Sequence, residues 1–532
     1  MAEQTKKVYG KENIFKRFGR GFVNFFAKSI PQFFTKKIPG FFKGFFGGIG
    51  RWFRAFGERF KTGSVGTKVS HFICGFGSFY HGQIIKGIIL LGLQVLFILY
   101  MVLCPAITGP NGIQVPSGYK SLINLGLGGH DASFTPTPGS SGWTPDGEFI
   151  PADSSFLMLL LGLVTIAVII LYIIIWLGNI KSSYAADTAV KEGRKPSTFV
   201  EDLKALGDNR FHVLMLTPTC LAALIFTLLP TILMICIAFT SYNINAMAAA
   251  EPPTELFHWV GFSNFADVFN PEATSSLGIE IGARFLPVLG WTFAWAILAT
   301  FSCYFGGILL AVLINKKGLK FKKVFRTIFI LTIAIPQFVS LLIMRNLLMA
   351  GGPVNSIIQK LGWANQDIGF LGMDKNDNPW VARVVVVIIN MWLGIPYTML
   401  MTSGILMNIP ADLYEAAKVD GTSRPKMFFK ITLPYVIFIT TPYLIGSFVG
   451  NINSFNTIFL LTGGGPAVIG DGATYTAGQT DLLVTWLYKL TIDQGDYNTG
   501  AVIGIFTFII TATITLITYR RSKAYNEEDT FQ

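Results

Sequence analysis

The sequence predicts an all-α membrane protein that crosses the bilayer about eight times. Its 532 residues are 51% hydrophobic and only 14% charged, whereas a typical soluble domain is about 25% charged. Apolar runs of roughly 20 residues are long enough to cross a hydrocarbon core of about 30 Å as helices. Any single run could instead be a buried helix in the core of a soluble protein. That alternative is a poor explanation for so many runs in one chain. The predicted spans lie near Ile84–Leu103, Phe156–Leu177, His212–Thr240, Phe285–Ile314, Val324–Met349, Val381–Ile405, Ile431–Leu461 and Gly500–Tyr519.

The distribution of Lys and Arg predicts the orientation of these spans. If the residues before the first span are cytoplasmic, most Lys and Arg of the connecting segments fall on the cytoplasmic side and few fall outside. Cytoplasmic loops of membrane proteins carry such an excess. We therefore expect both termini in the cytoplasm, and we interpret the net charge of +12 as a topology signal. No nucleic-acid partner is expected.

The chain divides into four predicted parts. The first is basic and rich in Phe, which favours short helices in an anionic membrane surface, in contact with lipids; a disordered basic tail is the alternative. Pro218 and Pro230 could break the third span, and the six spans from Phe211 onward form a predicted core. The parts are residues 1–83, the interfacial segment; 84–210, two accessory spans with an external, largely irregular loop at 104–154; 211–521, the six-span core with a polar loop at 408–434; and 522–532, a cytoplasmic tail.

The sequence contains no set of residues typical of a catalytic or metal site. Its five cysteines show no paired spacing, and none of the His or Ser residues falls in a hydrolase or metalloprotease motif. A phosphate-binding loop of the form GxxxxGK[ST] is also missing from the sequence, so this chain is not expected to bind ATP by that means. We expect no catalytic residue, no metal and no cofactor, and a transport subunit rather than an enzyme.

A polar stretch, YEAAKVDGTSRPKMFFKITLP, lies between two apolar runs. Pro410 fits the first turn of a helix, and Gly421 supplies the left-handed residue that ends it. Thr422 or Ser423 can cap a second helix. Spacing alone leaves open an ordinary amphipathic connector.

The same stretch resembles a signature of importer-type ABC transporter permeases, E-A-A-x3-G-x9-I-x-L-P. The matching residues are Glu415, Ala416, Ala417, Gly421, Ile431, Leu433 and Pro434. In that family this loop is the coupling helix that docks into a separate ATPase subunit. The resemblance assigns ATPase coupling to Glu415, Ala416, Ala417, Asp420 and Gly421.

Residues from about Phe211 to Arg521 are similar to the MalF-type permease subunit of maltose and maltodextrin importers, in "NMWLGIPYTMLMTSGILMNIPADLYEAAKVDG" and "NINSFNTIFLLTGGGP". The resemblance implies a heterodimer with a second, MalG-like permease, two ATP-binding subunits and an extracellular solute-binding lipoprotein. It also implies a bacterial cytoplasmic membrane location and alternating-access import of a neutral oligosaccharide.

Polar and aromatic residues within the spans predict where a sugar would bind. Amide groups can hydrogen-bond hydroxyls, an aromatic face can cover a sugar ring, and polar groups are costly in a bilayer unless they are used. On residue types alone, these groups could equally hydrogen-bond between helices. The MalF-type resemblance favours a sugar site at Asn390, Leu393, Gly394, Tyr397 and Asn451, to which we add Ser454 and Gln337.

Other functions remain open at this stage. An ABC permease for another oligosaccharide, a glycerol phosphate or a polyamine is one alternative, but a charged solute should recruit a compensating charge to mid-membrane. None lies in the middle of the sixth or seventh predicted span. An ion-coupled transporter or channel is expected to carry intramembrane Asp or Glu, which the spans nearly lack. A membrane scaffold would leave the glycine-ended helix pair unexplained.

Overall fold

The structure is a computed structural model of the chain. It describes residues 54–103, 106–108, 114–116, 118–119, 121–122, 142–143, 149–150, 155–208, 211–244, 257–275, 277–316, 318, 320–468 and 477–521. The chain forms two compact units, Met1–Gly261 (unit 1) and Phe262–Gln532 (unit 2). Most of the basic, Phe-rich segment lies outside the described residues, and its predicted lipid contact stays a prediction. The predicted boundary at residue 211 also stays a prediction.

The described residues contain eight helices that are long and apolar enough to cross a membrane. This confirms an all-α polytopic membrane protein as the fold class. The eight candidate spans are Ile84–Leu103, Leu159–Lys191, Phe211–Ala238, Gly282–Ile314, Gln337–Lys360, Pro379–Met407, Arg424–Ile452 and Tyr497–Thr518.

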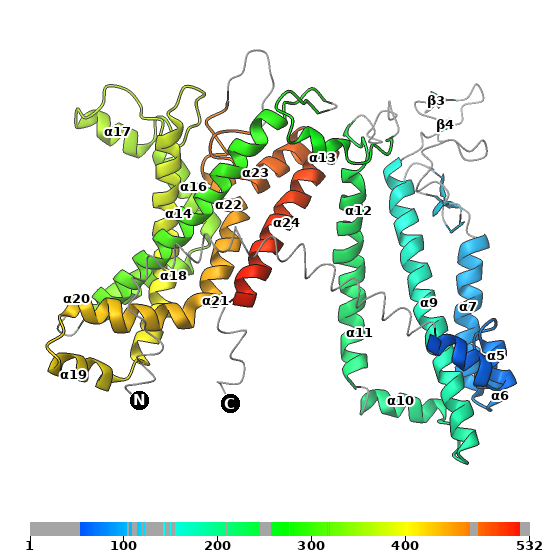
Figure 1. Cartoon of the computed structure of the whole chain (residues 1–532). Coiled ribbons are helices and arrows are strands. Elements are labelled where there is room, and N and C mark those ends of the chain that lie inside the picture. Colours follow the sequence, from blue (N-terminus) through cyan, green and yellow to red (C-terminus); the bar gives the residue numbers. More distant parts are fainter. Residues whose placement is uncertain are drawn as a thin grey trace. The chain divides into compact units, whose positions relative to one another are not determined.

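Unit 1 is built on three long helical segments and a short helical turn (Figure 1). The second span is longer than predicted, because the helix continues past the apolar run through a polar extension to Lys191. The elements of unit 1 are α5 (Val65–Ser70), α6 (Phe76–Tyr80), α7 (Ile84–Leu103), α9 (Ser155–Lys191), α10 (Phe199–Gly207), α11 (Phe211–Ala223), the π-helical turn η4 (Leu224–Leu228) and α12 (Leu229–Ala238).

The segment between α7 and α9 contains two short hairpins. β1 (Ala106–Thr108) pairs antiparallel with β2 (Gln114–Pro116), and β3 (Gly142–Trp143) pairs with β4 (Phe149–Ile150). The sequence analysis predicted a largely irregular loop here because Gly, Pro and Ser dominate its composition. Strands this short show almost no alternation of apolar and polar residues, so the sequence offered no basis for predicting them.

Side chains from the long helices of unit 1 hold the α5–α6 turn through its backbone. Asn179 Oδ1 accepts from the Gly75 N–H at 3.0 Å, and Gln94 Oε1 accepts from the Cys74 N–H at 2.7 Å. The Trp176 indole donates to the His71 carbonyl at 2.9 Å. Backbone groups in an apolar setting need such partners, and this turn receives them from α7 and α9.

Unit 2 holds the remaining helices. In Figure 1, α17 lies at one end of this unit, and α19 and α20 lie at the opposite end. The elements are α13 (Ser263–Asp267), α14 (Gly282–Ile314), α15 (Lys322–Ala334), α16 (Gln337–Leu348), α17 (Pro353–Lys360), α18 (Pro379–Met407), α19 (Ala411–Val419), α20 (Arg424–Met427), the π-helical turn η6 (Phe428–Thr432), α21 (Leu433–Ile452), α22 (Phe455–Leu461), α23 (Leu483–Tyr488), the π-helical turn η7 (Lys489–Asp493) and α24 (Tyr497–Arg521).

Two spans that the sequence predicts as continuous are interrupted. The fifth breaks between α15 and α16, where Ile335 is extended (φ −80°, ψ 127°) because a following proline disfavours helical backbone. The seventh breaks between α21 and α22, where Asn453 and Ser454 leave helical geometry. Asn and Ser side chains compete for backbone hydrogen bonds, which lowers their preference for helix interiors.

Prolines in two other helices are accommodated by wider turns. Pro230 and Pro434 each lie just after a π-helical turn, η4 and η6. A proline lacks the N–H for its helical bond, and its ring crowds the carbonyl four residues earlier. The prediction that Pro218 and Pro230 could break the third span was wrong. The helix α11 continues through Pro218, and a π-helical turn, instead of a break, precedes Pro230.

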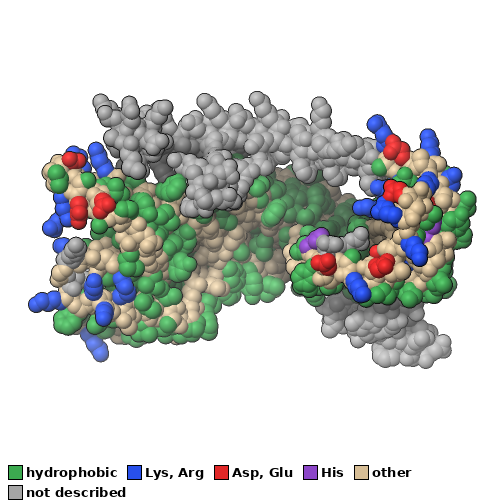
Figure 2. Space-filling view, turned by 90° about the horizontal axis from the view of Figure 1, so that it is seen from below, with side chains coloured by type: hydrophobic (Ala, Val, Ile, Leu, Met, Phe, Trp, Pro, Cys, Tyr) green, Lys and Arg blue, Asp and Glu red, His purple; other side chains and the backbone are tan. Residues whose placement is uncertain are grey.

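The core of unit 2 joins four of its spans. Trp291, Trp295 and Ala299 of α14 pack with residues of α16, α18 and α22 in one buried cluster. Large flat side chains bury much area, so they dominate such contacts. The Arg383 guanidinium lies over the Trp291 ring of this cluster, 4.5 Å from its centroid. Other Lys and Arg side chains gather over the α19–α20 end of unit 2 in the view of Figure 2.

Candidate functional site

The polar loop has the predicted helix, glycine corner and second helix. α19 ends at Val419, and Gly421 has a left-handed φ of 66°. The Gly421 N–H donates to the Lys418 carbonyl at 3.0 Å, and the Thr422 N–H donates to the Ala417 carbonyl at 2.9 Å. These two bonds form a Schellman motif, which satisfies the last carbonyls of the helix.

Two details of the loop differ from the prediction. Pro410 precedes α19 as its cap residue instead of occupying the first turn, with φ −56° and ψ 129°. The second helix, α20, starts after Ser423, one of the two predicted caps, and contains Pro425 in its first turn. It then continues through η6 into α21, so the corner is joined to a span without a flexible linker.

The loop presents an exposed, mixed surface. Glu415, Ala416 and Asp420 are exposed, and Ala417 is half-buried. Val419 is 88% exposed, which leaves an apolar contact beside the two carboxylates. A hydrogen bond of 2.8 Å between the Tyr414 hydroxyl and the Thr432 hydroxyl ties α19 to η6. The surface is therefore held in a fixed position relative to α21.

The predicted sugar residues on α18 face α14. Asn390 Nδ2 lies 3.4 Å from Cys303 Sγ, and the same thiol donates to the Asn390 carbonyl at 3.5 Å. A Cβ at Gly394 would lie 2.6 Å from this sulfur, so a glycine is needed for the two helices to approach. Leu393 packs against the unit 2 core.

Asn451, on α21, is held by the same helix α14. Its Nδ2 donates to the Thr300 hydroxyl at 2.8 Å, and its carbonyl accepts from the Trp295 indole at 3.1 Å. Thr300 lies three residues before Cys303, on one face of α14. The two predicted amides thus share one supporting surface. Each side chain is only half-buried and keeps hydrogen-bonding capacity.

Tyr397 forms an aromatic pair one turn along α18. Its ring lies 5.7 Å from that of Tyr443 on α21, at an interplanar angle of 33°. The Tyr397 side chain is 53% exposed, whereas Tyr443 is fixed by a 3.3 Å hydrogen bond between its hydroxyl and that of Thr398. An exposed ring of this kind can cover the apolar face of a sugar.

Gln337 and Ser454 belong to a separate group. Both contact the Thr457 hydroxyl of α22, Gln337 Nε2 at 3.5 Å and Ser454 Oγ at 3.2 Å. Asn451 and Ser454 are three residues apart in the predicted seventh span, but the chain leaves helical geometry between them. The break lets Ser454 face Thr457 and the start of α16.

The structure therefore brings Asn390, Gly394 and Asn451 against α14 and brings Gln337 and Ser454 to Thr457, whereas Tyr397 pairs with Tyr443 of α21. Sequence reasoning missed Thr300, Cys303, Thr457 and Tyr443, which hold these residues. The only sequence signal for the first two is their spacing within a run of small residues on α14. Within the described residues, no group of His, Cys, Asp and Glu could hold a metal ion.

Comparison with known proteins identifies the family. A model described as "Binding-protein-dependent transport system inner membrane component" matches residues 304–524. The chain is 32% identical to the galactooligosaccharides transport system permease protein GanP of Bacillus subtilis, over 86% of this chain and 97% of the relative. It is 31% identical to the maltodextrin transport system permease protein MalC of Streptococcus pneumoniae, over 86% and 95%.

A shorter match covers the part of the chain that carries the signature. The chain is 35% identical to the maltose/maltodextrin transport system permease protein MalF of Escherichia coli, over 49% of each chain. The MalF-type resemblance and the multi-pass membrane location are thereby confirmed. Together with the eight spans, these matches show that the chain belongs to the family of binding-protein-dependent transport system inner membrane components.

Proposed function

We propose that this chain is the permease subunit of an ATP-driven importer of a neutral oligosaccharide of the maltodextrin or galactooligosaccharide type. The observation that carries the proposal is its similarity to two sugar permeases over 97% and 95% of their lengths. The partners would be a second permease, two ATP-binding subunits and an extracellular solute-binding lipoprotein. ATP would be hydrolysed by the ATP-binding subunits.

The loop around Gly421 supports the coupling part of this proposal. Its exposed Glu415 and Asp420 offer charge, and Val419 offers apolar area, to a soluble partner. Because α20 continues through η6 into α21, a displacement of the loop would be transmitted to the span that carries Asn451. ATP binding needs only to favour one state of the transporter, and each tenfold shift in that equilibrium corresponds to about 1.4 kcal/mol.

The two groups of polar residues support the sugar-binding part. Asn390, Asn451 and Tyr397 supply two amides and an exposed ring on helices that pack against α14, without a charged side chain among them. A neutral, hydroxyl-rich ligand needs these group types. The residues would face both sides of the membrane in turn as the spans rearrange, with the loop at 408–434 on the cytoplasmic side.

Substitutions at the coupling loop test the proposal in the assembled transporter. Glu415→Lys reverses a charge at the docking surface, and Gly421→Pro removes the left-handed corner. Each should abolish ATP-dependent sugar uptake while the protein remains in the membrane. Gly421→Asn is the matched control, because Asn tolerates left-handed backbone and a Cβ there meets nothing within 4 Å. Its uptake should stay close to wild type.

Normal uptake by either damaging variant would overturn the coupling assignment. The substrate class is tested separately, by offering maltodextrins, galactooligosaccharides and sn-glycerol 3-phosphate to proteoliposomes that contain the wild-type transporter. Transport of the phosphate ester instead of the neutral sugars would reject the proposed substrate.

A further inference from the structure

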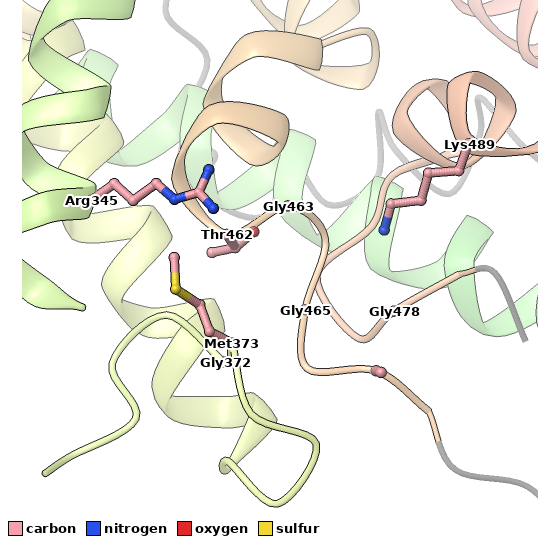
Figure 3. A pocket seen from close by; sticks show the side chains of 9 residues that line it. Arg345, Gly372, Met373, Thr462, Gly463, Gly465, Gly478 and Lys489 are labelled. Carbon is pink, nitrogen blue, oxygen red and sulfur yellow. The ribbon is translucent and has the colours of Figure 1, made fainter. Parts of the chain in front are cut away.

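A cavity of about 320 Å³ lies in unit 2, among residues that the coupling and sugar sites do not use. It is formed by loops that connect α16 to α18 and α22 to α23, and by the side chains of α16 and η7. Figure 3 shows Arg345 and Lys489 reaching toward the Thr462–Gly465 loop from opposite sides. The lining residues are Arg345, Gly372, Met373, Thr462, Gly463, Gly465, Ala467, Gly478 and Lys489.

The two cations of the cavity are in different electrostatic states. Lys489 Nζ forms an ion pair of 2.7 Å with Asp481, whose side chain is fully buried. Asp481 also accepts hydrogen bonds from the Gly478 N–H at 2.7 Å and the Thr485 hydroxyl at 2.8 Å. The buried carboxylate is thus satisfied by three donors, one of which is the lysine of the ion pair. Lys489 is therefore a fixed part of the wall.

Arg345 has no such partner. Among the described residues no carboxylate forms an ion pair with it, and its guanidinium makes one long hydrogen bond of 3.5 Å, to the Leu460 carbonyl. A guanidinium has five N–H donors in a planar fork, so most of its donors remain available to the cavity. The fork geometry matches a carboxylate, which it can bind through two parallel hydrogen bonds.

Further positive charge lies behind the cavity wall. Arg284 donates to the carbonyl of Ala477 at 3.2 Å, and Arg383 donates to the carbonyl of Gln479 at 2.8 Å. Both side chains therefore hold the segment that carries Gly478. Among the charged residues that line the cavity or hold the segment of Gly478, three arginines and Lys489 outnumber Asp481, and this local excess of positive charge attracts an anion.

The glycines leave room for a ligand but do not bind it through their backbones. The N–H groups of Gly463, Gly465 and Gly478 donate to Ile458, Thr462 and Asp481, respectively. The donors open to the cavity are thus the side chain of Arg345 and the remaining hydrogens of Lys489. Of the two cations that line the cavity, only Arg345 has no ion pair among the described residues. Its single charge, and a volume at the small end of ligand pockets, fit one monoanionic group on a ring-sized molecule.

We propose that this cavity is a binding subsite for the carboxylate of a sugar acid. Arg345 and Gln337 lie on the same helix, α16, eight residues apart, which corresponds to about 12 Å along its axis. Thr457 lies on α22, and Thr462 follows the end of that helix. The cavity and the candidate sugar group at Thr457 are therefore built on the same two helices, α16 and α22. The inference rests on the proposed function for the sugar, and it adds an acidic unit to the accepted substrates.

Direct binding to the purified, complete transporter tests the subsite. The probes are glucuronate and glucose, which differ in the carboxylate, and binding is measured by calorimetry at low and high salt. Glucuronate should bind more tightly than glucose, and its affinity should fall as salt rises. Arg345→Gln should weaken glucuronate binding at least tenfold and leave glucose unchanged, while Arg345→Lys should have an intermediate effect.

Lys375→Gln is the matched charge control. Lys375 is an exposed residue of the α17–α18 loop and does not line the cavity, so its loss should not alter glucuronate binding. Thermal unfolding and uptake of a neutral maltodextrin, measured on the same preparations, establish that Arg345→Gln is folded. Equal glucuronate binding by wild type and Arg345→Gln, or equal affinities for glucuronate and glucose in the wild type, would overturn the proposal.

One further result would also overturn it. If Arg345→Gln weakens docking of the solute-binding protein but not glucuronate binding, Arg345 would be assigned to a carboxylate of that protein. If glucuronate binds as expected but no neutral sugar is transported, the proposed function fails and the subsite stands.

Discussion

Helices α7 and α14 have the same mean hydropathy over their most apolar windows, but they pack very differently. Only 6% of that window is buried within the described protein in α7, against 39% in α14. In α14 the small residues Ala296, Thr300, Cys303 and Gly307 recur at spacings of four and three, and all are buried. Such a stripe lets neighbouring helices approach closely. Hydropathy therefore identifies a span, whereas the placement of small residues identifies the face that packs.

The largest expected effect comes from removing a core side chain of α14. Trp295 is fully buried, and its indole donates to the Asn451 carbonyl. Trp295→Ala should cost about 3–5 kcal/mol of unfolding free energy, since it leaves a cavity and removes one of the donors to the Asn451 carbonyl. Leu96→Ala on α7, where the side chain is 64% exposed, should change it by about 0.5 kcal/mol or less.

Thermal and denaturant unfolding of the purified protein in one detergent measure both variants. If the two substitutions destabilise the protein equally, α7 and α14 do not differ in burial in the purified protein. That result would also remove the reason for regarding α14 as the support of the sugar residues.

Removing a polar side chain that lies on α7 or contacts α14 should have an intermediate effect. Asn390→Ala and Asn451→Ala each remove one amide, which typically costs about 1–3 kcal/mol, and should weaken sugar uptake roughly tenfold or more. Gln94 is the comparison on α7, where it binds the Cys74 N–H and the Phe72 carbonyl. Gln94→Ala should lower stability or yield and leave the sugar concentration for half-maximal uptake unchanged.

Sugar binding by the isolated solute-binding protein is the control, because that step precedes the permease. Wild-type uptake in both Asn variants would mean that these amides only join helices to α14. A Thr300→Val variant separates the roles further: it keeps the shape of the support and removes the acceptor for Asn451, so it should reproduce part of the Asn451→Ala effect.

The smallest effect concerns two buried carboxylates. Asp187 in unit 1 accepts hydrogen bonds from Ser64, Thr67 and His81, so Asp187→Asn should destabilise the protein. Asp496 in unit 2 is fully buried, with Ser275 and Thr499 beside its oxygens. Burial raises the pKa of Asp496, and the neighbouring Ser275 and Thr499 only partly offset this.

The sign of the pH effect follows from that raised pKa. Between the pKa of the unfolded chain and the raised pKa of the native state, the native protein binds the extra proton, so stability falls as pH rises. Asp496→Asn should remove this pH dependence and cause no loss of stability at neutral pH. Unfolding midpoints from about pH 4 to pH 8 measure it; a clear loss at neutral pH would show that the ionised carboxylate has a favourable partner.

The sequence predicted local features well and distant contacts poorly. The corner at Gly421 could be predicted because a left-handed glycine and its flanking helices depend on neighbouring residues alone. Asn390 and Asn451 could be named from composition and resemblance, but their partners Cys303 and Thr300 are 87 and 151 residues away. No local pattern encodes such pairs. The break at Asn453 escaped prediction because the apolar runs on both sides of the short polar stretch NINS together read as one long span.

The cavity at Arg345 escaped prediction for a different reason. Its walls are glycines, which carry no side-chain signal, and its charged residues come from separate helices. In the sequence, Arg345 and Lys489 read as two isolated cations near the ends of spans. Only the fold reveals that one of them is neutralised by Asp481 and the other is not.

The wide turn η6 has a consequence for the evolution of chain length. A π-helical turn bonds each N–H to the carbonyl five residues back instead of four, so it contains one residue more than the α-helical path between the same ends. Removing one residue from Phe428–Thr432 would restore an ordinary helix and preserve the angular phase of the residues on either side. Relatives can therefore differ by a single residue here without rotating α21 against the loop. The same deletion inside α21 would turn every later side chain, including Asn451, by about 100°.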